Sequence, residues 1–391
     1  MTPRSTVIIP CYNHGHYLSH TVNSVLAQTF SDWEAIIVDD GSNDDTRAVA
    51  AQFDDPRIHY IYQENRGLAA ARNRGIAEAQ GEWIAFLDAD DLWCPDFAAT
   101  MLAHTEEVNG HVGVIISGWQ YATKDGTPLG PSRSVDATEI TFERLLLGNP
   151  CPLHASITRQ TCIKQIGGFA SGFTGVEDWY FLLSIAQNGY HFVSIPQTLV
   201  LYRQVPGSMS RNVPMMRDNG LRVLDEIYSR NDLSEAALRL KESAYGRVNL
   251  WAGANYFGIG SAEAGMAQFI DAITNYPTLL ETLDTYYAIL CAEQPLPFKG
   301  SEEALDLDSA ETRLHAVLDN VFTLHPEFIE RWCNCSRQLS SIALSKLAEA
   351  QGQYRRSGSY LLQNLVHRPS RPQIRQLARV LTKGIVSRIS R

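Results

Sequence analysis

The feature that most constrains this chain is the stretch 83–93, WIAFLDADDLW, in which an apolar run ends abruptly in carboxylates. The apolar part, residues 83–87, is short, aromatic and aliphatic, which predicts a buried strand. Asp88, Asp90 and Asp91 follow it. Ligands of open α/β sheets bind beyond the carboxyl ends of the strands, and oxygen-only sites favour Mg²⁺ or Mn²⁺ shared with substrate phosphates. The alternative is a solvated turn that caps the next helix, and this stretch alone favours neither interpretation.

The residues before this stretch alternate between apolar runs and helical patterns. Apolar runs occupy residues 6–10, 33–38 and 58–62, and a segment of helical periodicity or composition follows each of them. With the run at 83–87 the order is strand, helix, strand, helix, strand, helix, strand. This order predicts an α/β fold with a mainly parallel sheet and right-handed crossovers.

A second strand of this sheet also ends in carboxylates, Asp39 and Asp40. The carboxyl ends of parallel strands meet at one rim, so we expect this pair to share a rim with Asp88 and Asp90, where a nucleotide-binding crevice commonly lies. The phosphate fingerprints GxGxxG and GxxxxGK[ST] are both absent from the sequence. The phosphates of a nucleotide would therefore be met by a metal instead.

Composition limits the class of protein. The 391 residues, 45% hydrophobic and 19% charged, are typical of a soluble globular chain with a catalytic domain and one further unit. A net charge of -10 argues against a nucleic-acid binder. Seven cysteines without a CxxC pair indicate a reducing compartment. Because neither a signal-peptide pattern nor an uncharged apolar run of ~18 residues occurs, we expect a cytoplasmic protein.

Four motifs occur in the order and at the spacing of the family 2 glycosyltransferases, and together they resemble that family closely. They are residues 7–13 (VIIPCYN), 37–42 (IVDDGS), 65–73 (NRGLAAARN) and 86–91 (FLDADD). The resemblance continues to Ser210 and covers about residues 4–212. It implies a GT-A fold, a nucleotide-sugar donor, a divalent metal and inversion at the anomeric carbon.

The resemblance also implies a role for each matching residue. Asp39 matches the carboxylate that accepts a hydrogen bond from the base, usually from a uracil N3–H. Pro10 and Tyr12 match the loop that borders the base, whereas Asp40 is read as a turn residue. Arg72 matches a basic residue near the nucleotide, although a solvated helix charge is the alternative.

The remaining roles concern the diphosphate and the reaction. Asp88 and Asp90 match the DxD pair, in which the first carboxylate faces the ribose and Asp90 ligates the metal. Asp178 matches the general base of the ED motif, and Glu177 is the weaker candidate for that role. A positioned base is needed because the acceptor hydroxyl is a poor nucleophile at neutral pH. The alternative is that Asp178 is an acid of a first helical turn, which the helix dipole favours.

Two further residues are candidates for contact with substrates. Residues 202–210 resemble a flexible lid, so Arg203 could meet the diphosphate as the lid closes, and a passive connector is an equal alternative. Many relatives carry a histidine where Val205 stands, which puts a histidine contact to the diphosphate in doubt here. His154 is read as a core or loop histidine, with contact to the acceptor as the alternative.

The C-terminal part changes to a helical pattern. Residues 247–277 and 340–369 look like degenerate tetratricopeptide repeats in a helical bundle packed on the catalytic domain. The predicted domains are a GT-A catalytic domain at 1–214, a helical domain at 215–371 and a basic amphipathic helix at 372–391. That last helix suits an anionic membrane surface, and an ordinary docked helix is its alternative.

These features predict an inverting, metal-dependent glycosyltransferase of the hexosyltransferase type, with Mn²⁺ or Mg²⁺ as cofactor. The donor would be a UDP-sugar, although dTDP would satisfy Asp39 equally well. The acceptor would be a hydroxyl of a cell-envelope glycan or a lipid-linked glycan, reached from the cytoplasm or from the inner face of the cell membrane. The family's processive members carry a QxxRW signature, which is absent here, so we expect single-sugar transfer. The competing hypothesis is a catalytically idle scaffold that binds sugar nucleotides.

Overall fold

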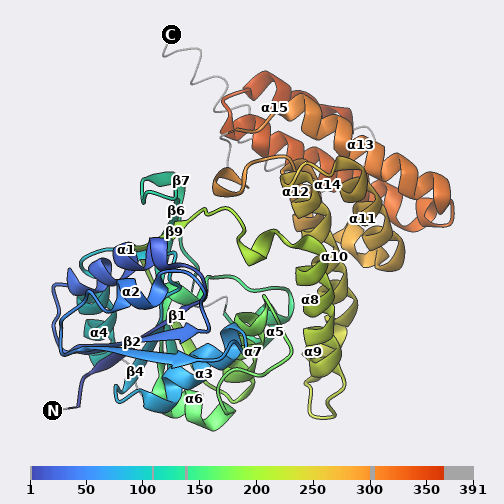
Figure 1. The fold of residues 1–391 in the computed structure, drawn as a ribbon. Coiled ribbons are helices and arrows are strands. Elements are labelled where there is room, and N and C mark those ends of the chain that lie inside the picture. Colours follow the sequence, from blue (N-terminus) through green and yellow to red (C-terminus); the bar gives the residue numbers. More distant parts are fainter. Residues whose placement is uncertain (1, 108–109, 137–139, 300–303, 365–391) are drawn as a thin grey trace. The chain divides into compact units, whose positions relative to one another are not determined.

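The computed structural model divides the chain into two compact units, Met1–Leu238 and Arg239–Arg391 (Figure 1). Each unit is described separately below. The structure describes residues 2–107, 110–136, 140–299 and 304–364.

The N-terminal unit is built on a mixed sheet of nine strands. Their order is β3-β2-β1-β4-β8-β6-β9-β5, and β7 pairs with β6 outside this path. The neighbours β3, β2, β1 and β4 are parallel, as the alternating pattern predicts. The strands are β1 (Ser5–Cys11), β2 (Trp33–Asp40), β3 (Ile58–Gln63), β4 (Trp83–Phe86), β5 (Leu92–Trp93), β6 (Val112–Ala122), β7 (Pro128–Arg133), β8 (Ser156–Arg159) and β9 (His191–Arg203).

Helices cover both faces of this sheet. The strand order places β3 and β4 on opposite sides of β1, so right-handed crossovers put α1 and α2 on one face and α3 on the other (Figure 1). The helices of this unit are α1 (Gly15–Leu26), α2 (Thr46–Ala50), α3 (Leu68–Glu78), α4 (Phe97–Glu107), α5 (Phe142–Leu146), α6 (Gln160–Ile166), α7 (Glu177–Gln187) and α8 (Val213–Tyr228). The short α9 (Glu235–Arg239) ends at the division between the units.

The core of this unit follows from the apolar runs. Every residue of β1, β2 and β4 is buried, because helices cover both faces of these strands. Gly75 of α3 allows the helix to lie directly on β1, since a Cβ at this position would meet Ile8 Cγ2 at 2.4 Å. Close packing of this kind fixes the height of α3 above the sheet, and with it the height of Arg72.

The carboxyl ends of the parallel strands meet at one rim. Cys11 of β1 lies opposite Asp39 of β2, and β4 ends at Phe86, which pairs with Ile8. The chain therefore leaves β1, β2 and β4 on the same side of the sheet. This arrangement confirms the shared rim for the two acidic segments that the sequence predicts.

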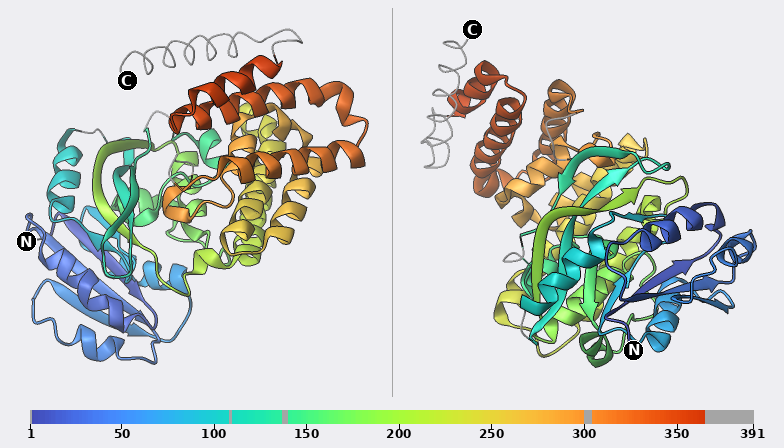
Figure 2. Two further views of the ribbon diagram at one scale, coloured as in Figure 1. Left: turned by 90° about the horizontal axis from the view of Figure 1, so that it is seen from above. Right: turned by 90° about the vertical axis from the view of Figure 1, so that its left-hand side faces the viewer.

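The second unit is helical. A buried cluster that includes Leu250, Phe269, Tyr286, Leu314 and Ala348 forms its core. Figure 2 shows its helices from two further sides. They are α10 (Lys241–Gly258), α11 (Ala262–Asn275), α12 (Leu283–Leu290), α13 (Leu307–Leu324), α14 (Phe328–Ala350) and α15 (Tyr354–Asn364).

The helical character of the C-terminal part is confirmed. α14 alone runs for 23 residues, Phe328–Ala350. None of the helices in the described ranges combines the length and the apolar character that crossing a membrane requires. The predicted amphipathic helix at 372–391 lies outside the described residues. The predicted change at residue 215 falls at the start of α8, which lies within the N-terminal unit, and the functional domain limits stay a prediction.

Candidate active site

The carboxylates after β4 form a tight loop, which we call the acidic loop, residues 88–91. The Asp91 N–H donates to the Asp88 carbonyl at 2.9 Å. Asp91 is only 1% exposed, and the next helix, α4, begins at Phe97. The interpretation of this stretch as a solvated turn that caps a helix is therefore wrong. The acidic loop turns inward instead and brings its carboxylates against the protein interior.

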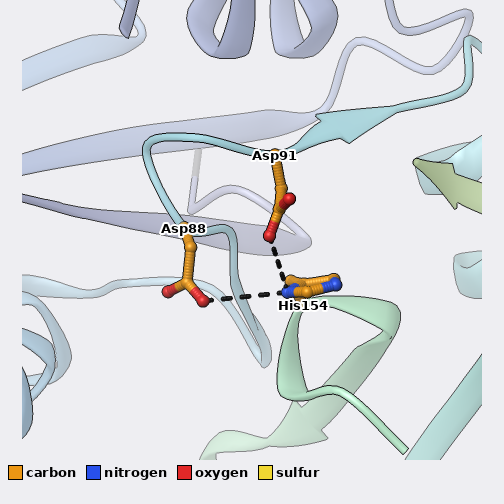
Figure 3. A group of neighbouring side chains, drawn as sticks. All are labelled: Asp88, Asp91 and His154. Atoms are coloured by element: carbon orange, nitrogen blue, oxygen red, sulfur yellow. Dashed lines mark ion pairs between the residues drawn. The ribbon is translucent and has the colours of Figure 1, made fainter. Parts of the chain in front are cut away.

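A buried histidine joins two of these carboxylates (Figure 3). His154 lies in the short 3-10 helix Leu153–Ala155, and its Nδ1 is 2.9 Å from Asp91 Oδ2 and 3.7 Å from Asp88 Oδ2. Burial alone would lower the pKa of His154, but the carboxylates of Asp91 and Asp88 outweigh it and raise that pKa to about 10. His154 is therefore an imidazolium at neutral pH, a cation placed between two carboxylates.

Arg72 links the acidic loop to the start of α7. Its guanidinium donates to Asp88 Oδ1 and to Glu177 Oε1, each at 2.8 Å, and is 3% exposed. Burial would raise the pKa of Asp88, but Arg72 and His154 outweigh it and hold that pKa below its usual range. Asp88 thus stays ionised and is held from two sides. Glu177 is likewise committed to Arg72, which leaves its neighbour Asp178 as the other carboxylate of this turn.

Asp90 is the carboxylate of the loop that is not neutralised. Among the described residues, no hydrogen bond or ion pair joins its carboxylate to another side chain, whereas Asp88 and Asp91 each have a cationic partner. Burial and the like charges of Asp91 and Asp88 raise the pKa of Asp90 to about 8. A buried carboxylate under this repulsion is relieved by a nearby cation.

The residues of the loop fit a divalent cation. Ligand atoms of Asp88, Asp91 and His154 lie within 4.8 Å of one another, a spacing that a metal ion could bridge. In this group, however, the His154 ring already supplies the positive charge and contacts both carboxylates. Asp90 therefore has the greater need of a cation, and hard carboxylate oxygens are suitable ligands for Mg²⁺ or Mn²⁺.

Asp178 lies in the first turn of α7 and is half-buried. Its Oδ2 accepts a hydrogen bond from Asn149 Nδ2 at 2.9 Å, and its Oδ1 accepts one from the Trp179 N–H at 2.7 Å. Burial and the Glu177 carboxylate raise the pKa of Asp178 to about 7, against the opposing charge of Arg72. A carboxylate with a pKa near neutrality can accept a proton during a reaction and release it afterwards.

The residues predicted to bind the base lie at the same rim. Asp39 is 1% exposed, and its two oxygens accept hydrogen bonds from the Ser42 N–H at 2.8 Å and from the Tyr60 hydroxyl at 2.6 Å. Pro10 is buried in β1, whereas Tyr12 is 47% exposed. A carboxylate offers about four lone-pair sites, so Asp39 keeps capacity for a further donor.

Asp40 has a structural role, as the sequence interpretation favours. Its carboxylate accepts hydrogen bonds from Gln63 Nε2 at 2.6 Å and from the backbone N–H groups of Arg66 and Gly67 at 2.9 and 2.8 Å. Gly67 supports this turn with a φ of 86°, a conformation that favours glycine. The end of β2 thereby holds the loop that leads into α3.

Arg203, the predicted lid residue, is engaged inside the protein. Its Nε donates to the Asp90 carbonyl and its Nη2 to Thr21 Oγ1, the latter at 3.0 Å. The side chain is 1% exposed and lies over the Tyr17 ring at 5.0 Å. These contacts attach the end of β9 to the acidic loop, and contact with a diphosphate stays a prediction.

The structure thus brings Arg72, Asp88 and the start of α7 together, and it joins Arg203 to the backbone of Asp90. Sequence reasoning missed Asp91 and His154 as partners. Asp91 could have been suspected, because a third carboxylate beside an apolar run needs a cation when it is buried. His154 carries no such signal, since a single histidine among prolines is a common loop residue.

Comparison with known proteins shows the family of this chain. The model of glycosyl transferase family 2 matches residues 6–162. A Bacillus subtilis protein named as a glycosyltransferase of teichuronic acid biosynthesis is 34% identical over 54% of this chain and 82% of its own. An Escherichia coli UDP-Glc:α-D-GlcNAc-diphosphoundecaprenol β-1,3-glucosyltransferase is 28% identical over 53% of this chain and 79% of its own.

Solved structures show the same fold. S. aureus TarS 1–349 in complex with UDP-GlcNAc has a TM-score of 0.53 at 19% identity, over 90% of this chain and 93% of that chain. A Pyrobaculum calidifontis mannosyltransferase in complex with GDP-Man and Mn²⁺ has a TM-score of 0.50 at 18% identity, over 68% and 75%. The sheet with its helical C-terminal region therefore has the fold of the GT-A glycosyltransferases. The chain belongs to glycosyl transferase family 2 and is a glycosyltransferase.

Proposed function

We propose that this protein is an inverting, metal-dependent enzyme that transfers one sugar from a nucleoside-diphosphate sugar to a hydroxyl of a glycan. The observation that carries the proposal is Asp90, a half-buried carboxylate that has no cationic partner among the described residues, in a loop whose other carboxylates each have one. A carboxylate that is partly withdrawn from water and unpaired is costly to the folded protein. Its presence is explained if a cationic ligand neutralises it. A donor diphosphate with its cation is the ligand that suits this position.

Asp90, with the exposed side of Asp88, would hold the divalent cation. When bound, such a cation neutralises the charge that develops on the departing diphosphate. Arg72 keeps Asp88 ionised and in place, while the rim residues Asp39 and Tyr12 border the nucleoside. UDP is the expected nucleotide because of the family resemblance, and dTDP offers Asp39 the same N3–H.

Asp178 would act as the general base. It removes the proton of the acceptor hydroxyl as the oxygen attacks the anomeric carbon from the side opposite the diphosphate, which inverts the configuration. Asn149 orients one carboxylate oxygen, and the Trp179 N–H holds the other. Because Arg72 engages Glu177, only one of the two adjacent carboxylates is available as a base.

A cavity of about 480 Å³ beside the start of α7 supports a saccharide acceptor. Apolar side chains such as Phe173 line it together with polar ones, among them Arg66, Asn73 and Glu177. Sugars present both apolar C–H faces and hydroxyl groups, so a mixed lining of this kind suits them. The glycan products named for the relatives support a cell-envelope glycan, free or lipid-linked, as the acceptor.

Calorimetry tests the donor site without an acceptor. UDP, dTDP and GDP are titrated into the protein with Mn²⁺ or with EDTA. We expect one nucleotide to bind with Mn²⁺ and to bind more than about 10-fold more weakly with EDTA or in Asp90→Asn. The exposed carboxylate of Asp125 supplies the matched control, Asp125→Asn, which should bind as the wild type does. Metal-independent binding, or equal binding by Asp90→Asn, would overturn the metal assignment.

A further inference from the structure

The acidic loop is surrounded by a buried polar cluster, of which only Arg203 is also a predicted substrate contact. We call it the clamp, and its four members are Thr21, Asp91, His154 and Arg203. Their exposed fractions are 0%, 1%, 3% and 1%. They come from α1, the loop after β4, the 3-10 helix before β8 and the end of β9. Four separate parts of the chain thus meet at one short loop.

Thr21 is the centre of the clamp on the α1 side. Its hydroxyl lies 2.7 Å from the carbonyl oxygen of Ala89 and 2.9 Å from that of Asp91, and it accepts a hydrogen bond from Arg203 Nη2 at 3.0 Å. These carbonyls flank Asp90 in the chain. A valine at this position would have the same shape without the hydroxyl, so Arg203 Nη2 and the carbonyls of Ala89 and Asp91 would each lose this partner.

Asp91 and Arg203 close the clamp on the other side. Asp91 Oδ1 accepts a hydrogen bond from the Arg203 backbone N–H at 2.8 Å, and Asp91 Oδ2 is paired with His154. The Arg203 Nε donates to the carbonyl of Asp90 itself. The backbone carbonyls of residues 89, 90 and 91 therefore each lie within hydrogen-bond distance of a side chain of the clamp.

Packing alone does not explain this cluster. Replacing a buried ionic group by apolar side chains of similar volume is often neutral or stabilising, so a buried charge is weak evidence for stability. His154 Nε2 is moreover buried without a hydrogen-bond partner among the described residues, which adds a cost. What the polar groups supply is a single conformation for the backbone that carries Asp90.

We propose that Thr21, Asp91, His154 and Arg203 are positioning residues that fix the acidic loop, so that the Asp90 carboxylate is aimed at the metal–diphosphate of the donor. The metal part of this proposal rests on the proposed function, whereas the fixed loop does not. Partners beyond the ligand shell that orient a metal ligand typically contribute 10- to 100-fold to metal affinity.

The first experiment measures the loop in the metal-free protein. Hydrogen exchange of the backbone amides of residues 88–93 is compared in wild type, Thr21→Val and Thr158→Val. Thr158 is also fully buried, and its hydroxyl has no hydrogen-bond partner in the part of the chain that the structure describes, so it is a matched control for the chemical change. We expect Thr21→Val to speed exchange of these amides about 10-fold and Thr158→Val to leave it unchanged. Equal exchange in wild type and Thr21→Val would overturn the clamp, whatever the donor is.

The second experiment measures the metal ligand. Mn²⁺ is titrated into the protein with UDP and followed by electron paramagnetic resonance, which needs no turnover. Thr21→Val and His154→Gln should bind Mn²⁺ at least about 10-fold more weakly, while UDP affinity in EDTA stays at the wild-type value. Thr21→Ser restores the hydroxyl and should recover most of the Mn²⁺ affinity.

The outcomes separate the two proposals. If the wild type binds no Mn²⁺ with UDP while Thr21→Val speeds exchange of the loop, the fixed loop stands and its metal role fails together with the proposed function. If Thr158→Val weakens Mn²⁺ binding as much as Thr21→Val does, general softening of the unit is the cause and the clamp is wrong. If Thr21→Val does not fold, His154→Gln and Thr21→Ser decide the same question with smaller changes.

Discussion

At the scale of single residues, the site separates carboxylates by their partners. Asp88 and Asp91 are matched by Arg72 and His154, whereas burial and like charges raise the pKa of Asp90 to about 8. Three aspartates within four positions therefore differ in whether a cationic side chain neutralises them. This separation is the physical basis for assigning structural, donor-binding and metal-binding roles within one short loop.

Asp178→Asn tests the general base. The amide keeps the shape and can still pair with neighbouring groups, but it cannot accept the acceptor's proton. We expect kcat for transfer to fall at least about 100-fold while donor affinity changes little. Initial rates and calorimetry on the same protein preparations check this. A fall of less than about 3-fold in kcat would exclude Asp178 as the base.

The pH dependence of the reaction gives an independent test of the same residue. The base is active only when ionised, and its pKa of about 7 lies above the ordinary carboxyl range because of burial and Glu177. The rate should therefore rise about 10-fold per pH unit below pH 7 and level off above it. A profile of kcat/KM at saturating Mn²⁺ measures this, and a flat profile from pH 5.5 to 8 would contradict it.

At the scale of elements, the position of α3 depends on one carboxylate at the end of β2. Asp40 accepts hydrogen bonds from the backbone N–H groups of Arg66 and Gly67, which fixes the loop that leads into the helix bearing Arg72. The rim at the carboxyl ends of the strands is thus built by strand residues such as Asp39 and by the loops that follow the strands.

Asp40→Asn should loosen this connection. In the variant an amide N–H group faces donors that meet a carboxylate oxygen in the wild type, so a partly buried N–H group, of Arg66, Gly67 or Gln63, loses its partner. We expect the free energy of unfolding to fall by about 2 kcal/mol, with Asp54→Asn, an exposed carboxylate, close to wild type. Chemical denaturation measures both. Equal stability of the two variants would show that the loop does not depend on Asp40.

The sequence predicts some strands of the sheet well and the positions of others poorly. The parallel strands β1, β2 and β4 follow from their apolar runs, since burial on both faces demands continuous apolar residues, whereas the partly exposed β3 follows from its β-branched and aromatic residues. β8 inserts antiparallel between β4 and β6, and no local pattern shows this because strand order depends on contacts distant in sequence. For the same reason His154 could not be placed beside Asp88 from the sequence.

At the scale of the whole molecule, two compact units make up the chain, and every candidate residue for donor binding and catalysis lies in Met1–Leu238. The helical unit has its own apolar core, which includes Phe269, Tyr286 and Leu314. The sequence predicts no ligand for this unit, because degenerate repeat patterns indicate helices without indicating a ligand. The proposed metal-dependent cleavage of a sugar nucleotide, with Asp90 as a metal ligand, needs residues of the N-terminal unit alone.

Release of nucleoside diphosphate from a panel of UDP-, dTDP- and GDP-sugars tests that claim most directly. Wild type and Asp90→Ala are compared with Mn²⁺, Mg²⁺ or EDTA, with and without a glycan extract as acceptor. We predict turnover of one donor that needs the cation, rises with the acceptor and is lost in Asp90→Ala. Turnover that persists in EDTA or in Asp90→Ala would contradict the metal-dependent mechanism, and metal-dependent nucleotide binding without turnover of any donor would favour an idle scaffold.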